Sequence, residues 1–101
     1  MKRVKMTRVV GGLRYDTEKA TLLAHDVYWA NDSWERGGHN RWLYRTPRGR
    51  YFVVTGTLWA GERDNLEPVP LEEAMRLYEG PLTEHEVPYE EAFPAVVVEK
   101  A

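Results

Sequence analysis

The chain has 101 residues, a formal net charge of −2 at pH 7 and 43% hydrophobic residues, among them four Trp and six Tyr. This length suits one hydrophobic core, so we expect a single domain over residues 1–101, and the many large rings exclude a disordered chain. The absence of Cys excludes disulfides and thiolate sites, and without a signal peptide or the roughly 18 apolar residues of a membrane span we expect a cytoplasmic protein with no membrane contact.

A β-hairpin is predicted near the N-terminus. Two β-prone runs, residues 6–10 and 13–15, flank Gly11 and Gly12. Two consecutive glycines supply the positive φ angles that a two-residue hairpin turn requires.

A short helix is predicted next, beginning at Asp16 and Thr17 and reaching about Ala24. Asp and Thr side chains accept hydrogen bonds from the first amides of a helix, and Glu18 lies near its positive end. Beyond this segment we expect a β-prone run and two loops, at residues 27–29, 31–33 and 37–40.

The clearest pattern is a long hairpin with a basic tip. Residues 41–45 and 50–59 are rich in β-branched and aromatic side chains, which predicts two strands. Residues 46–49 join them, with a Pro that suits the first corner of a turn and a Gly that suits the left-handed position.

The main predicted helix runs from Pro70 to Glu79 and is ended by Gly80 and Pro81. Its apolar side chains recur at the spacing of one helical face, which predicts that this face covers one side of a sheet. The face consists of Leu71, Ala74, Met75 and Tyr78.

The segments around this helix are short. Residues 60–67 are predicted to form a loop, and residues 68–70 (Pro-Val-Pro) to end any strand. Thr83 is expected to cap a further turn, and residues 89–93 to form a helical turn that seats two aromatic rings. Residues 95–98 form either an added strand or a segment that becomes ordered with a partner.

These elements predict an α+β fold, a small antiparallel β-sheet with one main covering helix and short additional helices. Because side chains alternate along a strand, Trp42 and Tyr44 should lie on one sheet face and Leu43 on the other. At least one set of rings therefore belongs to the core.

The sequence carries no recognisable catalytic, metal or cofactor motif. Its single Ser, Ser33, lacks a Gly-x-Ser-x-Gly elbow, and no phosphate-cradling glycine-rich loop is present. The spacing of His25, His39 and His85 matches no metal-ligand pattern, so a metal site would require that they converge in space. We therefore predict a protein that is not an enzyme, and an enzyme whose site combines dispersed residues is the alternative.

Charge is divided unequally along the chain. Residues 1–50 hold eleven Lys and Arg against five Asp and Glu, whereas residues 51–101 hold three against eleven. This division is typical of a half that faces nucleic acid, of an acidic binding face, or of two halves that attract each other across the fold.

The basic hairpin is the most specific functional feature. Arginines around a turn can contact phosphates, and interleaved aromatic rings can stack on bases, so one hypothesis is a nucleic-acid-binding surface. An ordinary solvated pair of strands is the alternative. The candidate residues are Arg41, Arg45, Arg48, Arg50 and Tyr51.

Four blocks of the sequence resemble those of one protein family, in the same order. They are GLRYDTEKA (12–20), LYRTPRGRYF (43–52), PLEEA (70–74) and YEEAF (89–93). The family is a group of small, largely uncharacterised proteins encoded by bacteriophages and integrative elements of bacteria. Its members have Gly-rich and Ser-rich residues after the second block, where this chain has TLWAG (57–61).

The resemblance implies an accessory protein of a mobile element in a bacterial cytoplasm, and it supplies no catalytic residues. Such proteins bind host proteins, for example a defence nuclease or complex, and include CRISPR inhibitors. An acidic surface that imitates DNA phosphates, with exposed aromatic rings for affinity, would serve that role. The candidate protein-binding residues are Trp34, Trp59, Glu62, Asp64 and Glu67.

Binding of a host protein is accordingly the leading hypothesis, and binding of nucleic acid through the basic hairpin is the second. A homodimer is a further expectation. The basic half of one copy could pair head to tail with the acidic half of another, or Val96–Val98 could pair as an edge strand across a twofold axis.

Overall fold

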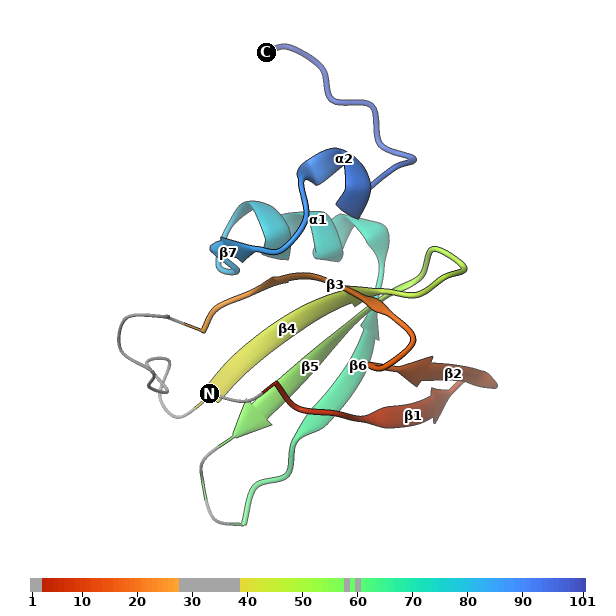
Figure 1. Cartoon of the computed structure of the whole chain (residues 1–101), viewed down its shortest axis with the longest axis vertical. Helices are drawn as coiled ribbons and strands as arrows, with labels where there is room; N and C mark the ends of the chain where they lie inside the picture. Colours follow the sequence, from red (N-terminus) through yellow and green to blue (C-terminus); the bar gives the residue numbers. More distant parts are fainter. Residues whose placement is uncertain (1–2, 28–38, 58, 60) are drawn as a thin grey trace.

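The computed structural model describes residues 3–27, 39–57, 59 and 61–101. Within them the chain forms, in order, β1 (Thr7–Val10), β2 (Leu13–Asp16), β3 (Thr21–His25), β4 (His39–Arg45), β5 (Tyr51–Thr57), β6 (Asn65–Val69), α1 (Leu71–Glu79), β7 (Glu84–His85) and α2 (Tyr89–Ala92). An antiparallel sheet has the strand order β6-β5-β4-β3-β7, and β1 and β2 pair as a separate hairpin (Figure 1). The expected α+β class is confirmed.

The central strands β4 and β5 bury side chains on both of their faces. Trp42 and Tyr44 point to one face of the sheet, and Leu43 points to the other, as the alternation predicted. Both sets belong to the core, because each face has its own cover. Burial on both sides explains the uninterrupted apolar runs at residues 42–44 of β4 and 51–54 of β5.

The two helices cover one face of this sheet (Figure 1). Helix α1 buries Ala74, Leu77 and Tyr78, with Leu71 and Met75 half-buried at the edge of the same cluster. The predicted covering helix is confirmed, with Pro70 as the residue before its first turn. The helical turn predicted near residue 90 is α2, and it is followed by the buried ring of Phe93.

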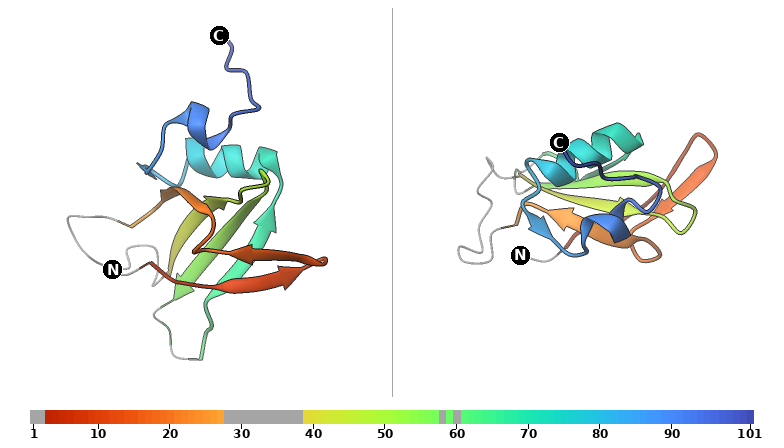
Figure 2. Two further views of the ribbon diagram at one scale, coloured as in Figure 1. Left: turned by 45° about the vertical axis from the view of Figure 1, so that its right-hand side comes forward. Right: turned by 90° about the horizontal axis from the view of Figure 1, so that it is seen from above.

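The β1–β2 hairpin covers the opposite face, and its tip projects past the side of the sheet (Figures 1 and 2). Its turn is the predicted pair of glycines, with φ angles of 59° at Gly11 and 78° at Gly12. The ring of Tyr15 packs edge-on against Phe52, with 5.6 Å between centroids. Arg8 donates a hydrogen bond to the Leu66 carbonyl oxygen over 2.6 Å and fixes the hairpin to β6.

The helix predicted from Asp16 to about Ala24 is wrong, because residues 21–25 form strand β3. The Thr17 hydroxyl, expected to cap a helix, accepts a hydrogen bond from the Met6 amide and donates one to its carbonyl. A bulge in β3 places Leu23 and Ala24 together in the helix-side core. Pairing with β4 and burial on the sheet outweigh the local capping signal.

The prediction that the loop extends over residues 60–67 is wrong at its end, because a strand begins at Asn65; that strand ends at Val69, within the Pro-Val-Pro segment expected to end it. Strand β6 spans Asn65–Val69 and contains Pro68, which lies opposite Phe52. Because β6 is an edge strand, a residue without an N–H group is tolerated on its outer side. The loop is shorter than expected, and Leu66 inside the strand is fully buried.

Three smaller expectations also differ from the structure. His39 and Asn40 begin β4 and are not in a loop, the strand expected to reach Trp59 ends at Thr57, and β7 replaces the turn that Thr83 was expected to cap. The loop predicted at residues 31–33 and most of the β-prone run predicted at 27–29 lie outside the described residues, as does the first half of the loop predicted at 37–40; Val27 is described and lies in no strand.

The C-terminal segment leaves α2 and extends away from the sheet (Figure 2). Residues 95–98 form no strand, and Val97 and Val98 are exposed. No helix in the described part of the chain is long and apolar enough to cross a membrane.

Candidate functional site

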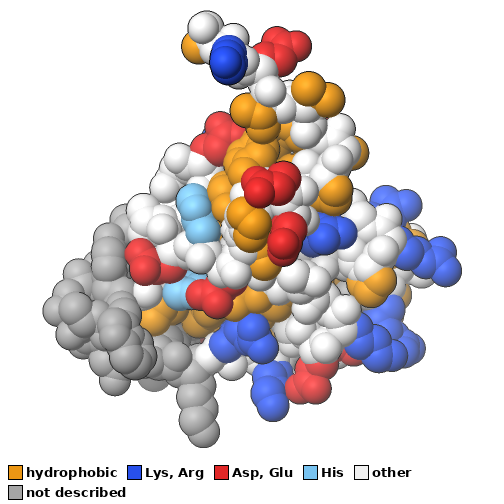
Figure 3. Space-filling view, turned by 45° about the horizontal axis from the view of Figure 1, so that its top comes forward, with side chains coloured by type: hydrophobic (Ala, Val, Ile, Leu, Met, Phe, Trp, Pro, Cys, Tyr) orange, Lys and Arg blue, Asp and Glu red, His pale blue; other side chains and the backbone are white. Residues whose placement is uncertain are grey.

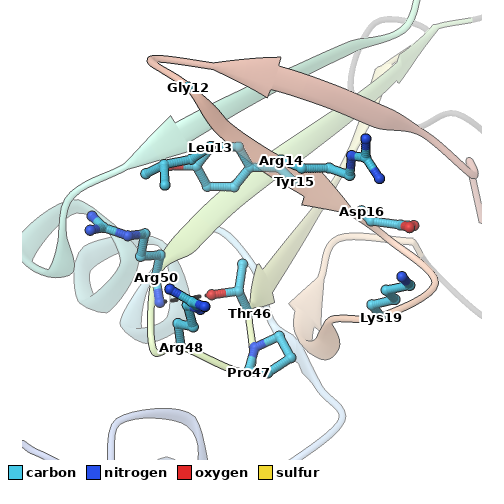
Figure 4. Close-up of a pocket in the computed structure, with 10 residues that line it drawn as sticks. All are labelled: Gly12, Leu13, Arg14, Tyr15, Asp16, Lys19, Thr46, Pro47, Arg48 and Arg50. Atoms are coloured by element: carbon cyan, nitrogen blue, oxygen red, sulfur yellow. Dashed lines mark hydrogen bonds between the residues drawn. The ribbon is translucent and has the colours of Figure 1, made fainter.

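A groove of about 310 Å³ lies between strand β2 and the turn that joins β4 to β5 (Figure 4). Residues from the hairpin border one side of it, and the turn borders the other. It is lined by Gly12, Leu13, Arg14, Tyr15, Asp16, Lys19, Thr46, Pro47, Arg48 and Arg50. Four of these side chains, those of Arg14, Lys19, Arg48 and Arg50, are cationic.

The turn carries Arg48 and Arg50 on a fixed backbone. The Gly49 amide donates to the Thr46 carbonyl over 2.9 Å, and the Arg50 amide donates to the Thr46 hydroxyl over 3.0 Å (Figure 4). Gly49 has a φ of 85°, so the predicted use of Gly at the left-handed position is confirmed. These bonds define the turn, and both arginine side chains are exposed on it.

Lys19 reaches the groove from the turn between β2 and β3. The Asp16 carboxylate accepts a hydrogen bond from the Glu18 amide over 2.9 Å, and the Lys19 amide donates to the Asp16 carbonyl. Thr17 in the same turn is buried and bonded to Met6. These bonds hold the backbone of Lys19 in place although its side chain is exposed.

Arg14 comes from β2 itself. On this strand Leu13 and Tyr15 turn toward the core, and the alternation of side chains leaves Arg14 exposed. None of Arg14, Lys19, Arg48 and Arg50 forms an ion pair with another residue that the structure describes. Asp16 is the one acidic side chain in the lining, so positive charge predominates there.

The space-filling view supports this separation of charge. Lys and Arg side chains gather along the right-hand side of the face drawn in Figure 3, with others near its lower edge, and most Asp and Glu side chains lie over its left, middle and upper parts. Both helices begin with a pair of Glu residues, at positions 72–73 and 90–91. The basic surface is consequently built by hairpins and turns, and not by helices.

Of the five residues predicted to contact nucleic acid, the structure brings Arg48 and Arg50 into the groove. Arg45 lies on the helix side of the sheet and donates a hydrogen bond to the Glu91 carbonyl over 3.1 Å. Arg41 lies on that side as well, close enough to Glu73 to help lower the pKa of that carboxyl, after the larger effect of Arg76. The Tyr51 ring is buried, so it is not exposed to stack on a base.

Of the predicted protein-binding residues, Trp59, Glu62 and Asp64 follow the opposite end of β5, about 20 Å from its start by the rise of a strand, whereas Glu67 lies in β6 opposite Val53. Trp59 is 54% exposed there, and Glu62, Asp64 and Glu67 are exposed too. Trp34 is outside the described residues.

Hydrogen bonds shape the loop that carries Glu62 and Asp64. Glu62 accepts one from the Thr57 hydroxyl over 2.6 Å and contacts the His39 ring nitrogen at 2.8 Å. The bond from Thr57, followed by that from His39, lowers the pKa of Glu62 below its ordinary value. Asp64 accepts a bond from the Thr57 amide over 3.0 Å, so two carboxylates close the loop onto the end of β5.

The three histidines do not converge. The ring nitrogen Nε2 of His25 meets Glu86, that of His39 meets Glu62, and that of His85 donates to the Tyr78 carbonyl. Within residues 3–27, 39–57, 59 and 61–101, no group of three or more His, Cys, Asp or Glu residues could hold a metal ion.

Sequence reasoning missed Arg14 and Lys19 as groove residues. Arg14 carried one usable signal, because the predicted Gly11-Gly12 hairpin with apolar Leu13 and Tyr15 implies an outward Arg14. Lys19 carried none, since it was assigned to a helix. In comparisons with protein-family models, curated proteins and solved structures, no match to this chain was found.

Proposed function

We propose that this protein binds nucleic acid through its phosphates, at the groove between β2 and the β4–β5 turn. The observation that carries the proposal is that four cations from three separate segments line one hollow without an ion-pair partner among the described residues. Cations of this kind gain binding free energy by releasing the counterions that surround phosphates. The fold holds together the three segments that present these cations, which are strand β2, the β2–β3 turn and the β4–β5 turn.

The chemistry of the groove favours nucleic acid over other anions. Its cations are joined by apolar surface from Leu13 and Pro47, which suits a ligand with both charge and flat apolar rings. The acidic first turns of α1 and α2 disfavour contact between those helix ends and a phosphate backbone. The groove side is therefore the side that would face the ligand.

The test is fluorescence anisotropy with labelled single-stranded and duplex oligonucleotides over a series of salt concentrations. With four phosphate contacts to a single strand, the slope of log K against log salt should be about −3. Arg48→Ala and Arg14→Ala should each reduce its magnitude by about 0.7. Arg63→Ala removes an exposed cation from the loop at the other end of β5 and is the matched control.

Equal losses in Arg48→Ala and Arg63→Ala would assign binding to net charge and overturn the proposal. Absence of binding at low salt for every oligonucleotide would overturn it as well. A thermal unfolding curve for each variant shows whether the fold is retained.

A second candidate function is the binding of a host protein by a mobile-element accessory protein, including inhibition of a defence complex. The specific observation in its favour is Trp59, a large ring 54% exposed beside the acidic Glu62 and Asp64. Exposed Trp residues are frequent anchors of protein interfaces, and surrounding carboxylates would speed association with a basic partner.

This candidate is tested by capture from bacterial lysate with and without nuclease. A partner that persists after nuclease, is lost with Trp59→Ala and is kept with Val9→Ala would support it, because Val9 is equally exposed at 59%. A partner that is lost with nuclease alone would favour the groove.

A further inference from the structure

We propose that the groove seats one unpaired base of a single strand, with its phosphates on the surrounding cations. This inference rests on the proposed function and names the form of nucleic acid that the groove selects. It follows from the way in which apolar and charged side chains are divided within the same hollow.

The interior of the groove is apolar. Leu13 is half-buried and Pro47 is exposed on the facing turn, so these two side chains supply its accessible apolar surface, whereas Tyr15 is only 5% exposed. Figure 4 shows Leu13 and Tyr15 on the hairpin side of the hollow and Pro47 on the turn side. A flat ring entering between Leu13 and Pro47 would contact apolar atoms on both of its sides, which is the environment that protein sites provide for unstacked bases.

The charged groups lie around this apolar interior. Arg14 extends from β2, Lys19 from the β2–β3 turn, and Arg48 from the β4–β5 turn (Figure 4). If the ring of a ligand occupied the middle of the groove, negatively charged groups attached on either side of that ring would lie near these cations. A strand of nucleic acid has this arrangement, since each base lies between two phosphates.

The size of the groove decides between single strand and duplex. Its volume of about 310 Å³ lies at the lower end of small-ligand pockets, which begin near 300 Å³. A duplex keeps its bases stacked and paired, so it could offer this hollow only its backbone, and the apolar interior would gain no contact. Extracting a base from a duplex costs additional free energy, which a single strand does not require.

The experiment compares three ligands on the unmodified protein: a short oligothymidylate, the same strand with abasic sites at every internal position, and a duplex of the same length. Removing the bases leaves the phosphates in place. We expect the abasic strand to bind about 5- to 150-fold more weakly than the oligothymidylate, the range for one stacked base. The duplex should also bind more weakly than the single strand.

A pair of variants then locates the base. Leu13→Ser should weaken binding of the oligothymidylate and leave binding of the abasic strand unchanged. Val9→Ser changes an apolar residue of the same hairpin that does not line the groove, and it should change neither affinity. Because Leu13 also packs against the core, the comparison of ligands on the unmodified protein decides the inference if this variant fails to fold.

The outcomes separate this inference from the proposed function. Equal affinity for the oligothymidylate and its abasic analogue overturns the seated base and leaves phosphate binding intact. Tighter binding of the duplex overturns it in the same way. Failure of all three ligands to bind at low salt overturns the proposed function, and the inference with it.

Discussion

The Tyr51 hydroxyl donates a hydrogen bond to the Ala92 carbonyl oxygen over 3.0 Å, and this bond joins the start of strand β5 to helix α2. Both residues are buried, so loss of the hydroxyl leaves a carbonyl without water to replace it. Tyr51→Phe should therefore lower the free energy of unfolding by about 1–2 kcal/mol. Chemical denaturation followed by Trp fluorescence measures the change.

Tyr44 provides the matched control for this prediction. Its hydroxyl oxygen is buried and has no hydrogen-bond partner among the described residues. Burial without a partner also raises the pKa of Tyr44, against a smaller opposing effect of Arg3. Tyr44→Phe should then be neutral or stabilising, and a loss as large as that of Tyr51→Phe would contradict this account.

Tyr89 should make the protein sensitive to alkaline pH. Burial, together with the hydrogen bond from its hydroxyl to the Glu79 carboxylate at 2.7 Å, raises the pKa of Tyr89 to about 12. An unfolded Tyr titrates near 10, so between pH 10 and 12 the unfolded state loses this proton while the folded state keeps it. The contribution of Tyr89 to stability is thus complete below about pH 10 and is lost as pH rises toward 12.

Ultraviolet absorbance of tyrosinate during an alkaline titration tests this prediction. Glu79→Gln removes the negative charge beside the phenol and should shift the pKa of Tyr89 downward, toward its ordinary value. Tyr89→Phe identifies which part of the absorbance belongs to this residue. An unchanged titration in Glu79→Gln would contradict the role given to the carboxylate.

Thr57 should control the acidity of Glu62. Its hydroxyl makes the largest contribution to the lowered pKa of Glu62, ahead of His39. The folded state therefore releases this proton more readily than the unfolded state. The resulting stability is present above the ordinary pKa of 4.5 and is lost as pH falls through the lower pKa of folded Glu62.

Thr57→Val keeps the shape of the side chain and removes the donor. It should raise the pKa of Glu62 toward 4.5, as followed by NMR of the carboxyl carbon. Thr7→Val changes an exposed Thr of β1 and should leave this titration unchanged. If the pKa of Glu62 stayed as low in Thr57→Val as in the unmodified protein, the contact with His39 would be sufficient to lower it.

The parts of the fold that could be predicted from sequence are those with local signals. The β4–β5 hairpin combines side-chain alternation with a Pro and a positive-φ Gly in its turn, and α1 has a complete apolar face. Strand β3 has no such signal, because Asp16 and Thr17 serve a turn as well as they would serve a helix start. Its strand state results from pairing with β4, which is distant in sequence.

The groove was predictable in part for a related reason. Arg48 and Arg50 belong to a turn that the sequence indicates directly, whereas Arg14 and Lys19 meet them only after the hairpin packs across the sheet. The alternation rule could have separated Arg41 and Arg45 from the tip, since both share a strand face with the core residue Leu43.

Arg45 and Arg48 should accordingly differ in what they support. Arg45→Ala removes the hydrogen bond to the Glu91 carbonyl on the helix side, so it should lower the free energy of unfolding by about 1 kcal/mol and leave the salt slope of oligonucleotide binding unchanged. Arg48→Ala, in the exposed turn, should change the free energy of unfolding by no more than about 0.5 kcal/mol and reduce the magnitude of the salt slope by about 0.7. Chemical denaturation measures the change in stability and fluorescence anisotropy measures the salt slope, both on the same preparations of each variant. If Arg45→Ala weakened oligonucleotide binding at full stability, the ligand surface would extend to the helix side of the sheet, because one groove on the hairpin side could not explain that loss.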